Sequence, residues 1–107
     1  MFFDNKRYFD FVAKCRKAGI NVPIIPGLKP IVSKKQLIAI PRNFYLNLPD
    51  SLIQAIESAK NPDHVREVGI EWCISQSKEL MENKVPVLHY YTMGKGASTE
   101  RIAKALF

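Results

Sequence analysis

Apolar residues recur at helical spacing in the first part of the chain. The recurring positions are Tyr8, Phe11, Val12 and Cys15. Asp4 or Asn5 can cap the start of this helix, because a side-chain oxygen there accepts from the free N–H groups of the first turn. Gly19 follows the pattern and suits the position just past a helix end. The pattern therefore predicts a helix that begins near Asn5 and is closed by Gly19.

A longer helix is predicted over residues 63–83. Its apolar residues form two stripes, Val65, Val68, Trp72 and Leu80 on one and Ile70, Ile74 and Met81 on the other. A helix that is apolar on two sides is packed between other elements. Shorter helices are predicted at 34–40, after Pro49-Asp50-Ser51 and after Ser98. Ser33 and Ser98 are the expected N-caps of the first and last of these, and Pro41 is the expected end of the first.

Two apolar runs predict β-strands, at residues 20–27 and 85–92. The first run is apolar without alternation, as in parallel strands that are covered on both faces. Pro23 cannot donate to a sheet ladder and favours an edge position instead, so both interpretations stand. The short stretch Met1-Phe2-Phe3 is predicted to be the end of a further strand.

Strands that alternate with helices indicate parallel pairing through right-handed crossovers. The resulting α/β structure is either an open doubly wound sheet or part of a closed barrel. Three strands are too few for either, because a lone three-stranded piece would expose apolar edges. We therefore expect residues 1–107 to be a single segment of something larger.

Composition limits the size and class of this protein. With 107 residues, 47% of them hydrophobic and 24% charged, the chain has the composition of one globular domain. A chain of this length buries roughly 65% of its unfolded surface, which excludes a complete large enzyme. No apolar run approaches the roughly 20 residues of a membrane span, and the N-terminus lacks the basic flank of a signal peptide. These features predict a cytoplasmic location and no membrane partner.

The charge balance is positive, but the basic residues are dispersed. Lys and Arg number 16 against 10 Asp and Glu, a net charge of +6, yet the longest basic run is Lys34-Lys35. We therefore expect no nucleic acid partner, whereas the positive field suits an anionic small molecule. Cys15 and Cys73 have no second cysteine or histidine at ligand spacing, so no metal site is expected and both are predicted to be buried free thiols.

Candidate site residues follow the strands, because ligands of parallel α/β proteins bind at the C-terminal strand ends. Gly94-Lys95-Gly96, which precedes a helix, is either a plain turn or a contact for an anion. Asp4 either caps a helix or faces the site. Tyr90 and Tyr91 point to opposite faces, one toward the site and the other toward the helices.

The two histidines are expected to have structural positions rather than catalytic roles. His89 lies within the last predicted strand, where a core or barrel-interior histidine is expected rather than a base. His64 is expected to be a first-turn helix residue. No catalytic group emerges from the residues alone.

Several runs carry a family resemblance. They are Phe2-Phe3-Asp4, Ala18-Gly19-Ile20, Val22-Pro23-Ile24-Ile25-Pro26-Gly27 with Pro30, Gly69-Ile70, and Leu88-His89-Tyr90-Tyr91-Thr92-Met93. In this order and spacing they resemble the C-terminal part of bacterial methylenetetrahydrofolate reductase, and the likeness covers essentially the whole chain. That family is an FAD-containing TIM barrel that reduces methylenetetrahydrofolate to methyltetrahydrofolate with NAD(P)H, for methionine synthesis. A full barrel needs roughly 250 residues, so the resemblance implies the last three βα units of a TIM (β/α)8 barrel, incomplete on its own.

The resemblance also implies a set of residues on the folate side of the site. Gln36 matches a Gln that contacts the folate tail, and Lys95 stands where some relatives have an Arg. Tyr91 and Met93 match residues lining the substrate groove. Ile40 occupies the place of a Phe that stacks on the aminobenzoate ring, where Ile packs but does not stack.

The acidic residue that protonates the substrate, and most contacts to FAD, belong by resemblance to earlier units. The chain would thus supply part of a folate-binding rim, inactive without the rest of the barrel. The alternative is a non-enzymatic α/β module that associates with another chain through its open sheet edge. Oligomerisation is compatible with both.

Overall fold

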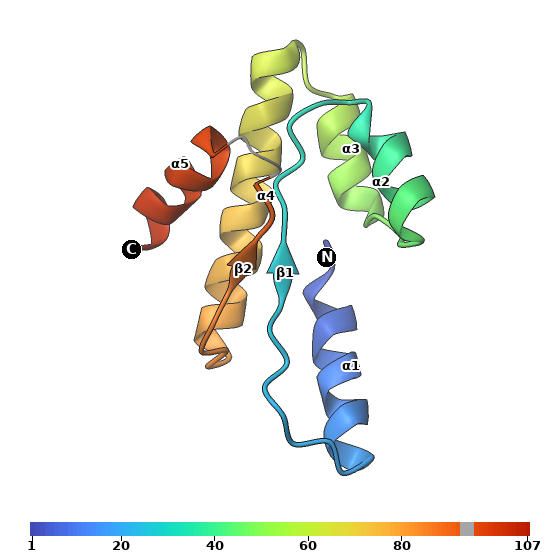
Figure 1. The fold of residues 1–107 in the computed structure, drawn as a ribbon. Coiled ribbons are helices and arrows are strands. Elements are labelled where there is room, and N and C mark those ends of the chain that lie inside the picture. Colours follow the sequence, from blue (N-terminus) through green and yellow to red (C-terminus); the bar gives the residue numbers. More distant parts are fainter. Residues whose placement is uncertain (93–95) are drawn as a thin grey trace.

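The computed structural model of the chain describes residues 1–92 and 96–107 (Figure 1). In this part of the chain the order of elements alternates helices with short strands. The elements are α1 (Asn5–Lys17), β1 (Gly27–Leu28), α2 (Gln36–Phe44), α3 (Asp50–Glu57), α4 (Pro62–Glu82), β2 (His89–Tyr90) and α5 (Ala97–Leu106). None of the described helices has the length and apolar character needed to cross a membrane.

The two strands pair in parallel. Gly27 lies opposite His89 and Leu28 lies opposite Tyr90. The His89 N–H donates to the Pro26 carbonyl at 3.0 Å, and the Tyr91 N–H donates to the Leu28 carbonyl at 2.9 Å. The chain between β1 and β2 passes through α2, α3 and α4 (Figure 1). This arrangement confirms the prediction of a parallel α/β structure.

Both strands are shorter than predicted. Before β1, hydrogen-bond donors outside the sheet bind the backbone carbonyl groups that a longer strand would use. Pro23 and Pro26 have no N–H to offer a neighbouring strand. Side chains on α1 instead bind its carbonyl groups: the Tyr8 hydroxyl donates to Ile24 at 2.6 Å, and Arg16 Nη1 donates to Ile20 and Val22 at 2.8 Å each. Residues 20–25 therefore lie against α1 rather than forming a strand.

The strand predicted at Met1-Phe2-Phe3 is wrong for this structure. No backbone ladder forms there; two side chains of α4 take up the carbonyl groups instead. Trp72 Nε1 donates to the Phe3 carbonyl at 2.9 Å, and Gln76 Nε2 donates to the Phe2 carbonyl at 3.3 Å. Phe3 is buried, so this stretch serves as an anchor in the core.

Three predictions about the short helices are wrong. Ser33 does not cap α2, because that helix begins only at Gln36 and has no side-chain cap. Pro41 lies inside α2 instead of ending it, and the helix continues to Phe44. Ser98 lies in the first turn of α5 rather than at its N-cap, which is Gly96.

The predicted closing motif of α1 is confirmed, and α4 ends in the same way. Gly19 has φ 86° and its N–H donates to the Arg16 carbonyl, while the Ile20 N–H reaches the Cys15 carbonyl. This pair of bonds satisfies carbonyl groups that the helix end leaves free. After α4, Lys84 takes the corresponding position with φ 62°, and two backbone N–H groups again donate to carbonyl groups of the helix end.

The apolar interior forms two clusters, which α4 joins. The first contains Phe3, Ile31, Ile40, Leu48, Leu52, Ile56, Ala59 and Val65. The second contains Leu28, Ile70, Cys73, Leu80 and Ile102. The two-sided apolar pattern predicted for the long helix is thereby confirmed, except that Leu80 packs in the second cluster and Met81 is exposed.

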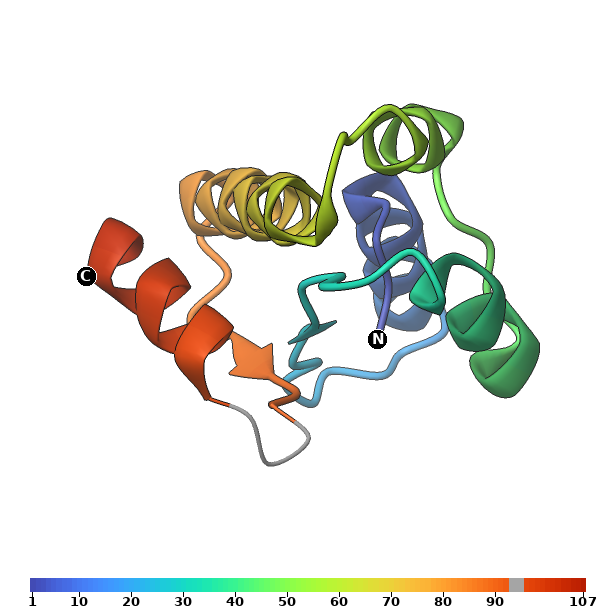
Figure 2. The same ribbon diagram turned by 90° about the horizontal axis from the view of Figure 1, so that it is seen from above.

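The helices cover one side of the strand pair. Viewed from above, α4 and α1 lie on the same side of β1 and β2, and the described residues place no helix over the opposite side (Figure 2). Exposed apolar side chains precede both strands: Val22 is 62% exposed and Val87 is 51% exposed. The expected exposure of apolar sheet edges stays a prediction. That the segment belongs to a closed barrel remains a proposal.

Candidate functional site

A groove of about 870 Å³ lies where the two strands end. It is bounded by the loop of residues 29–36 after β1, by Tyr91 and Thr92 after β2, and by the first turn of α5. Arg66 on α4 and Arg101 on α5 complete the described lining. We call this cavity the strand-end groove. Its position agrees with the general rule that parallel α/β proteins bind ligands at the C-terminal ends of their strands.

Gln36 lines the strand-end groove with a fixed amide. Its Oε1 accepts from the Val32 N–H at 2.7 Å and from the Ser33 N–H at 3.3 Å. Both contacts require an acceptor, so they set the orientation of the amide and leave Nε2 as its donor end. Gln36 can therefore offer N–H groups to an oxygen of a ligand.

Tyr91 forms part of the wall and lies on the open side of the strands. Its ring contacts the ring of His89 edge to face, with centroids 4.7 Å apart. A Cβ atom added to Gly27 would come within 2.5 Å of Tyr91 Cε2, so the absence of a side chain at Gly27 makes room for the ring. Tyr90 points the other way, where its hydroxyl hydrogen-bonds to the Ser77 hydroxyl of α4 at 2.7 Å. The prediction that one of the two tyrosines faces the helix layer is confirmed for Tyr90, and that Tyr91 faces a ligand site stays a prediction.

The described lining of the strand-end groove is basic and contains no carboxylate. Arg101 donates hydrogen bonds to both carboxylate oxygens of Glu67, and these bonds lower the pKa of the Glu67 carboxyl group. Arg66 lies 3.7 Å from Asp63 in an exposed pair. Burial lowers the pKa of Lys29, since desolvation disfavours its charged form. The groove therefore presents a positive surface to a ligand.

Of the five residues suggested by the family resemblance, the strand-end groove brings Gln36 and Tyr91 together. Ile40 lies elsewhere: it is 4% exposed and packs in the first apolar cluster. Met93 and Lys95 lie outside the described residues, and the roles suggested for them stay predictions.

Two basic residues of the groove, Arg66 and Arg101, were missed as candidates. Lys29 directly follows β1, so the rule that ligands bind at strand ends points to it. Arg66 and Arg101 lie on two helices that are distant in sequence but packed together. No spacing in the sequence indicates that these two residues meet at one cavity.

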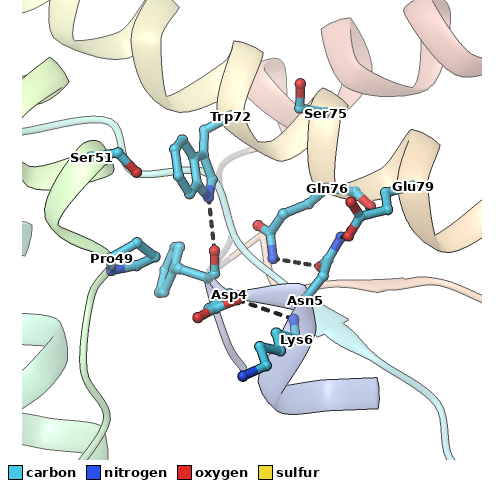
Figure 3. A pocket seen from close by; sticks show the side chains of 10 residues that line it. Asp4, Asn5, Lys6, Pro49, Ser51, Trp72, Ser75, Gln76 and Glu79 are labelled. Carbon is cyan, nitrogen blue, oxygen red and sulfur yellow. Dashed lines mark hydrogen bonds between the residues drawn. The ribbon is translucent and has the colours of Figure 1, made fainter. Parts of the chain in front are cut away.

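A second cavity of about 460 Å³ lies where α1 begins against α4 (Figure 3). Asp4 caps α1 here, since its Oδ1 accepts from the Lys6 N–H at 3.0 Å, which confirms the capping alternative. Asn5 Nδ2 donates to Glu79 at 2.9 Å, and Gln76 Nε2 donates to Asn5 Oδ1 at 3.2 Å. These polar groups fix the start of α1 on α4, so we interpret this cavity as a structural junction.

The structure shows different surroundings for the two histidines. His89 is exposed, so the expectation of a core histidine is wrong for this chain: its side of the strands carries no helix among the described residues (Figure 2). It stays a prediction that a closed barrel would cover His89. His64 lies in the first turn of α4, as expected, and its Nδ1 accepts from the Lys60 N–H at 3.2 Å.

The two thiols should differ in reactivity. Burial raises the pKa of the Cys73 thiol to about 12, whereas Cys15 is partly exposed. Because the thiolate is the reactive form, we expect a thiol reagent at about pH 8 to label Cys15 in the native chain and Cys73 only after denaturation. Mass spectrometry of the labelled peptides measures this difference, with a Cys15→Ser chain as control. Equal labelling rates for both thiols under native conditions would contradict the burial of Cys73.

Comparison with known proteins shows similarity along the whole chain. The family model described as methylenetetrahydrofolate reductase matches residues 1–107. A Caenorhabditis elegans protein named probable methylenetetrahydrofolate reductase (NADPH) is 34% identical over 108 residues, covering 99% of this chain and 16% of the relative. A 5,10-methylenetetrahydrofolate reductase of Salmonella typhimurium is 29% identical over 106 residues, covering 98% of this chain and 36% of the relative. The chain thus spans little more than a third of the bacterial relative and under a fifth of the nematode one.

Proposed function

Because the chain belongs to the methylenetetrahydrofolate reductase family, we propose that it supplies part of the folate-binding surface of such an oxidoreductase. The observation that carries this proposal is the strand-end groove, which joins Gln36 and Tyr91 at the ends of two parallel strands. In the complete enzyme, NAD(P)H would reduce methylenetetrahydrofolate to methyltetrahydrofolate through FAD. This segment would be the C-terminal part of the TIM barrel.

The proposed role of the groove residues is to bind and orient the folate. Gln36, with its amide fixed by two backbone N–H groups, donates from Nε2 to a substrate oxygen. Tyr91 supplies a flat apolar wall, since its ring is set in place by Gly27 and His89. Ordering one end of a substrate in this way helps to hold its reacting end in position.

The described residues do not by themselves form a site for FAD. The described residues place no helix over one side of the strand pair (Figure 2). That side offers one wall, where a flavin ring requires an enclosed pocket. By the family resemblance, the residue that protonates the substrate belongs to the part of the barrel outside this chain. We therefore propose that the chain is inactive alone and that other polypeptide provides the flavin site and the acid.

The alternative function is a non-enzymatic module that binds another chain through its open sheet edge. The exposed apolar side chains beside the strands, Val22, Ile25 and Val87, favour such an association. Both functions predict a partner, but only the first predicts folate binding and flavin reduction.

Fragment complementation would separate the two functions. We expect the purified chain to bind no flavin and to oxidise no NADH. Mixed with the Salmonella relative truncated where its similarity to this chain begins, it should restore the visible flavin band and an NADH oxidation that depends on methylenetetrahydrofolate. The truncated relative alone is the control. Flavin binding and turnover by the isolated chain would contradict the proposed need for a partner, and a flavin-free, inactive complex would favour the non-enzymatic module.

A further inference from the structure

The three cations among the described residues of the strand-end groove are not equivalent. Arg101 is engaged by Glu67, with Nη2 to Oε2 at 2.8 Å, and Arg66 lies near Asp63. Lys29 takes part in no ion pair or side-chain hydrogen bond among the residues that the structure describes. Of these three described cations, Lys29 is therefore the one whose charge is available to a ligand.

The backbone of Lys29 is firmly placed. Leu28 before it is paired to β2 and fully buried, and Pro30 after it is buried with a fixed φ. The side chain itself is half-buried in the wall of the groove. An ammonium group that has lost part of its hydration gains more from an anionic ligand than a fully exposed one does.

Other groups on the groove wall suit the same kind of ligand. Gln36 presents its Nε2 donor end, and Ser98 and Thr99 contribute hydroxyl groups. The described lining residues include no carboxylate, and Glu67 and Asp63, which lie beside lining arginines, are paired with Arg101 and Arg66. Donors of this kind recognise the oxygens of a carboxylate or a phosphate.

We propose that Lys29 is a specificity-determining residue that binds an oxyanion at the end of the ligand and makes the strand-end groove prefer ligands with several negative charges there. The inference rests on the proposed function in one respect, since the glutamate carboxylates of a folate are one source of such an oxyanion. A phosphate group, as in a nicotinamide dinucleotide, is the other source. Lys29 thereby sets which end of the substrate lies against β1.

The test compares binding to the full 107-residue chain by NMR titration. The probes are 5-formyltetrahydrofolate with one glutamate, the same compound with three glutamates, and inorganic phosphate. The variants are Lys29→Gln and Lys29→Arg, and the matched control is Lys78→Gln, an exposed lysine on α4 outside the groove. Circular dichroism of each variant checks that the fold is kept.

We expect Lys29→Gln to weaken binding of the triglutamate probe by about 5- to 10-fold and of the monoglutamate probe by about twofold. Lys29→Arg should stay within about twofold of the original chain because it keeps the charge. Equal affinities of Lys29→Gln and Lys78→Gln for the triglutamate probe would overturn the inference while leaving folate binding intact. Phosphate binding that depends on Lys29, without folate binding, would support the inference and contradict the proposed function. Absence of shifts at the Gln36 side-chain amide with every probe would overturn both.

Discussion

Replacing Gly69 with alanine is expected to lower the free energy of unfolding by about 3 kcal/mol or more. Gly69 lies in α4 where the loop after β1 crosses the helix, and an added Cβ would overlap the Ile31 carbonyl oxygen and lie 2.7 Å from the carbonyl carbon. The obstacle is backbone, so no side-chain rotation relieves it. In an unobstructed helix the same substitution would raise the free energy of unfolding by about 1 kcal/mol. The sign of the measured change therefore shows whether the added Cβ meets the Ile31 backbone.

Urea unfolding followed by circular dichroism measures this effect. The matched control is Gly96→Ala, because Gly96 has φ −89° and, apart from its chain neighbours, no described atom lies within 4 Å of an added Cβ. We expect the control to change stability by less than about 0.5 kcal/mol. A Gly69→Ala chain as stable as the original would show that α4 does not approach Ile31 closely.

The second large effect is expected for Ile102→Ala, which should lower the free energy of unfolding by about 3 kcal/mol. Ile102 is fully buried and joins α5 to Leu28, Ile70 and Leu80 in the second cluster. Removing three carbon atoms there leaves a cavity and weakens the docking of α5. Since the first turn of α5 lines the strand-end groove, ligand affinity should fall together with stability.

The control for this change is Ile38→Ala, in which the same atoms are removed from a side chain that is 74% exposed. We expect Ile38→Ala to lower the free energy of unfolding by less than about 0.5 kcal/mol. Thermal unfolding gives the stability of both variants, and hydrogen exchange of the α5 amides reports whether that helix is released. Similar losses for Ile38→Ala and Ile102→Ala would contradict the burial of the α5 face.

The sequence predicts the elements of this fold better than their ends. Five helices and a parallel strand pair follow from apolar periodicity, and Asp4 and Gly19 mark the two ends of α1 through local hydrogen bonds. The ends of the strands depend on competition between distant donors. Tyr8 and Arg16 take carbonyl groups that a strand would otherwise have used, and no local pattern reveals this.

The candidate site was also predicted from the sequence only in part. Gln36 and Tyr91 follow from family resemblance, and the structure places both in one groove. Ile40 was expected at the ligand, yet it lies on the face of α2 that packs in the first apolar cluster. The basic wall made by Lys29, Arg66 and Arg101 depends on the packing of α5 against α4, which sequence spacing does not encode.

The sequence by itself determined the class of this protein, an α/β segment with parallel strands, and its membership of a reductase family. Both are carried by local features: side-chain periodicity, helix-end residues and short runs along the chain. Only the tertiary structure decided which of the described cations in the strand-end groove has no carboxylate partner among the described residues, and which side of the strands the described helices leave uncovered. Those properties arise where residues far apart in the chain come into contact, because ion pairing and burial depend on distance in space.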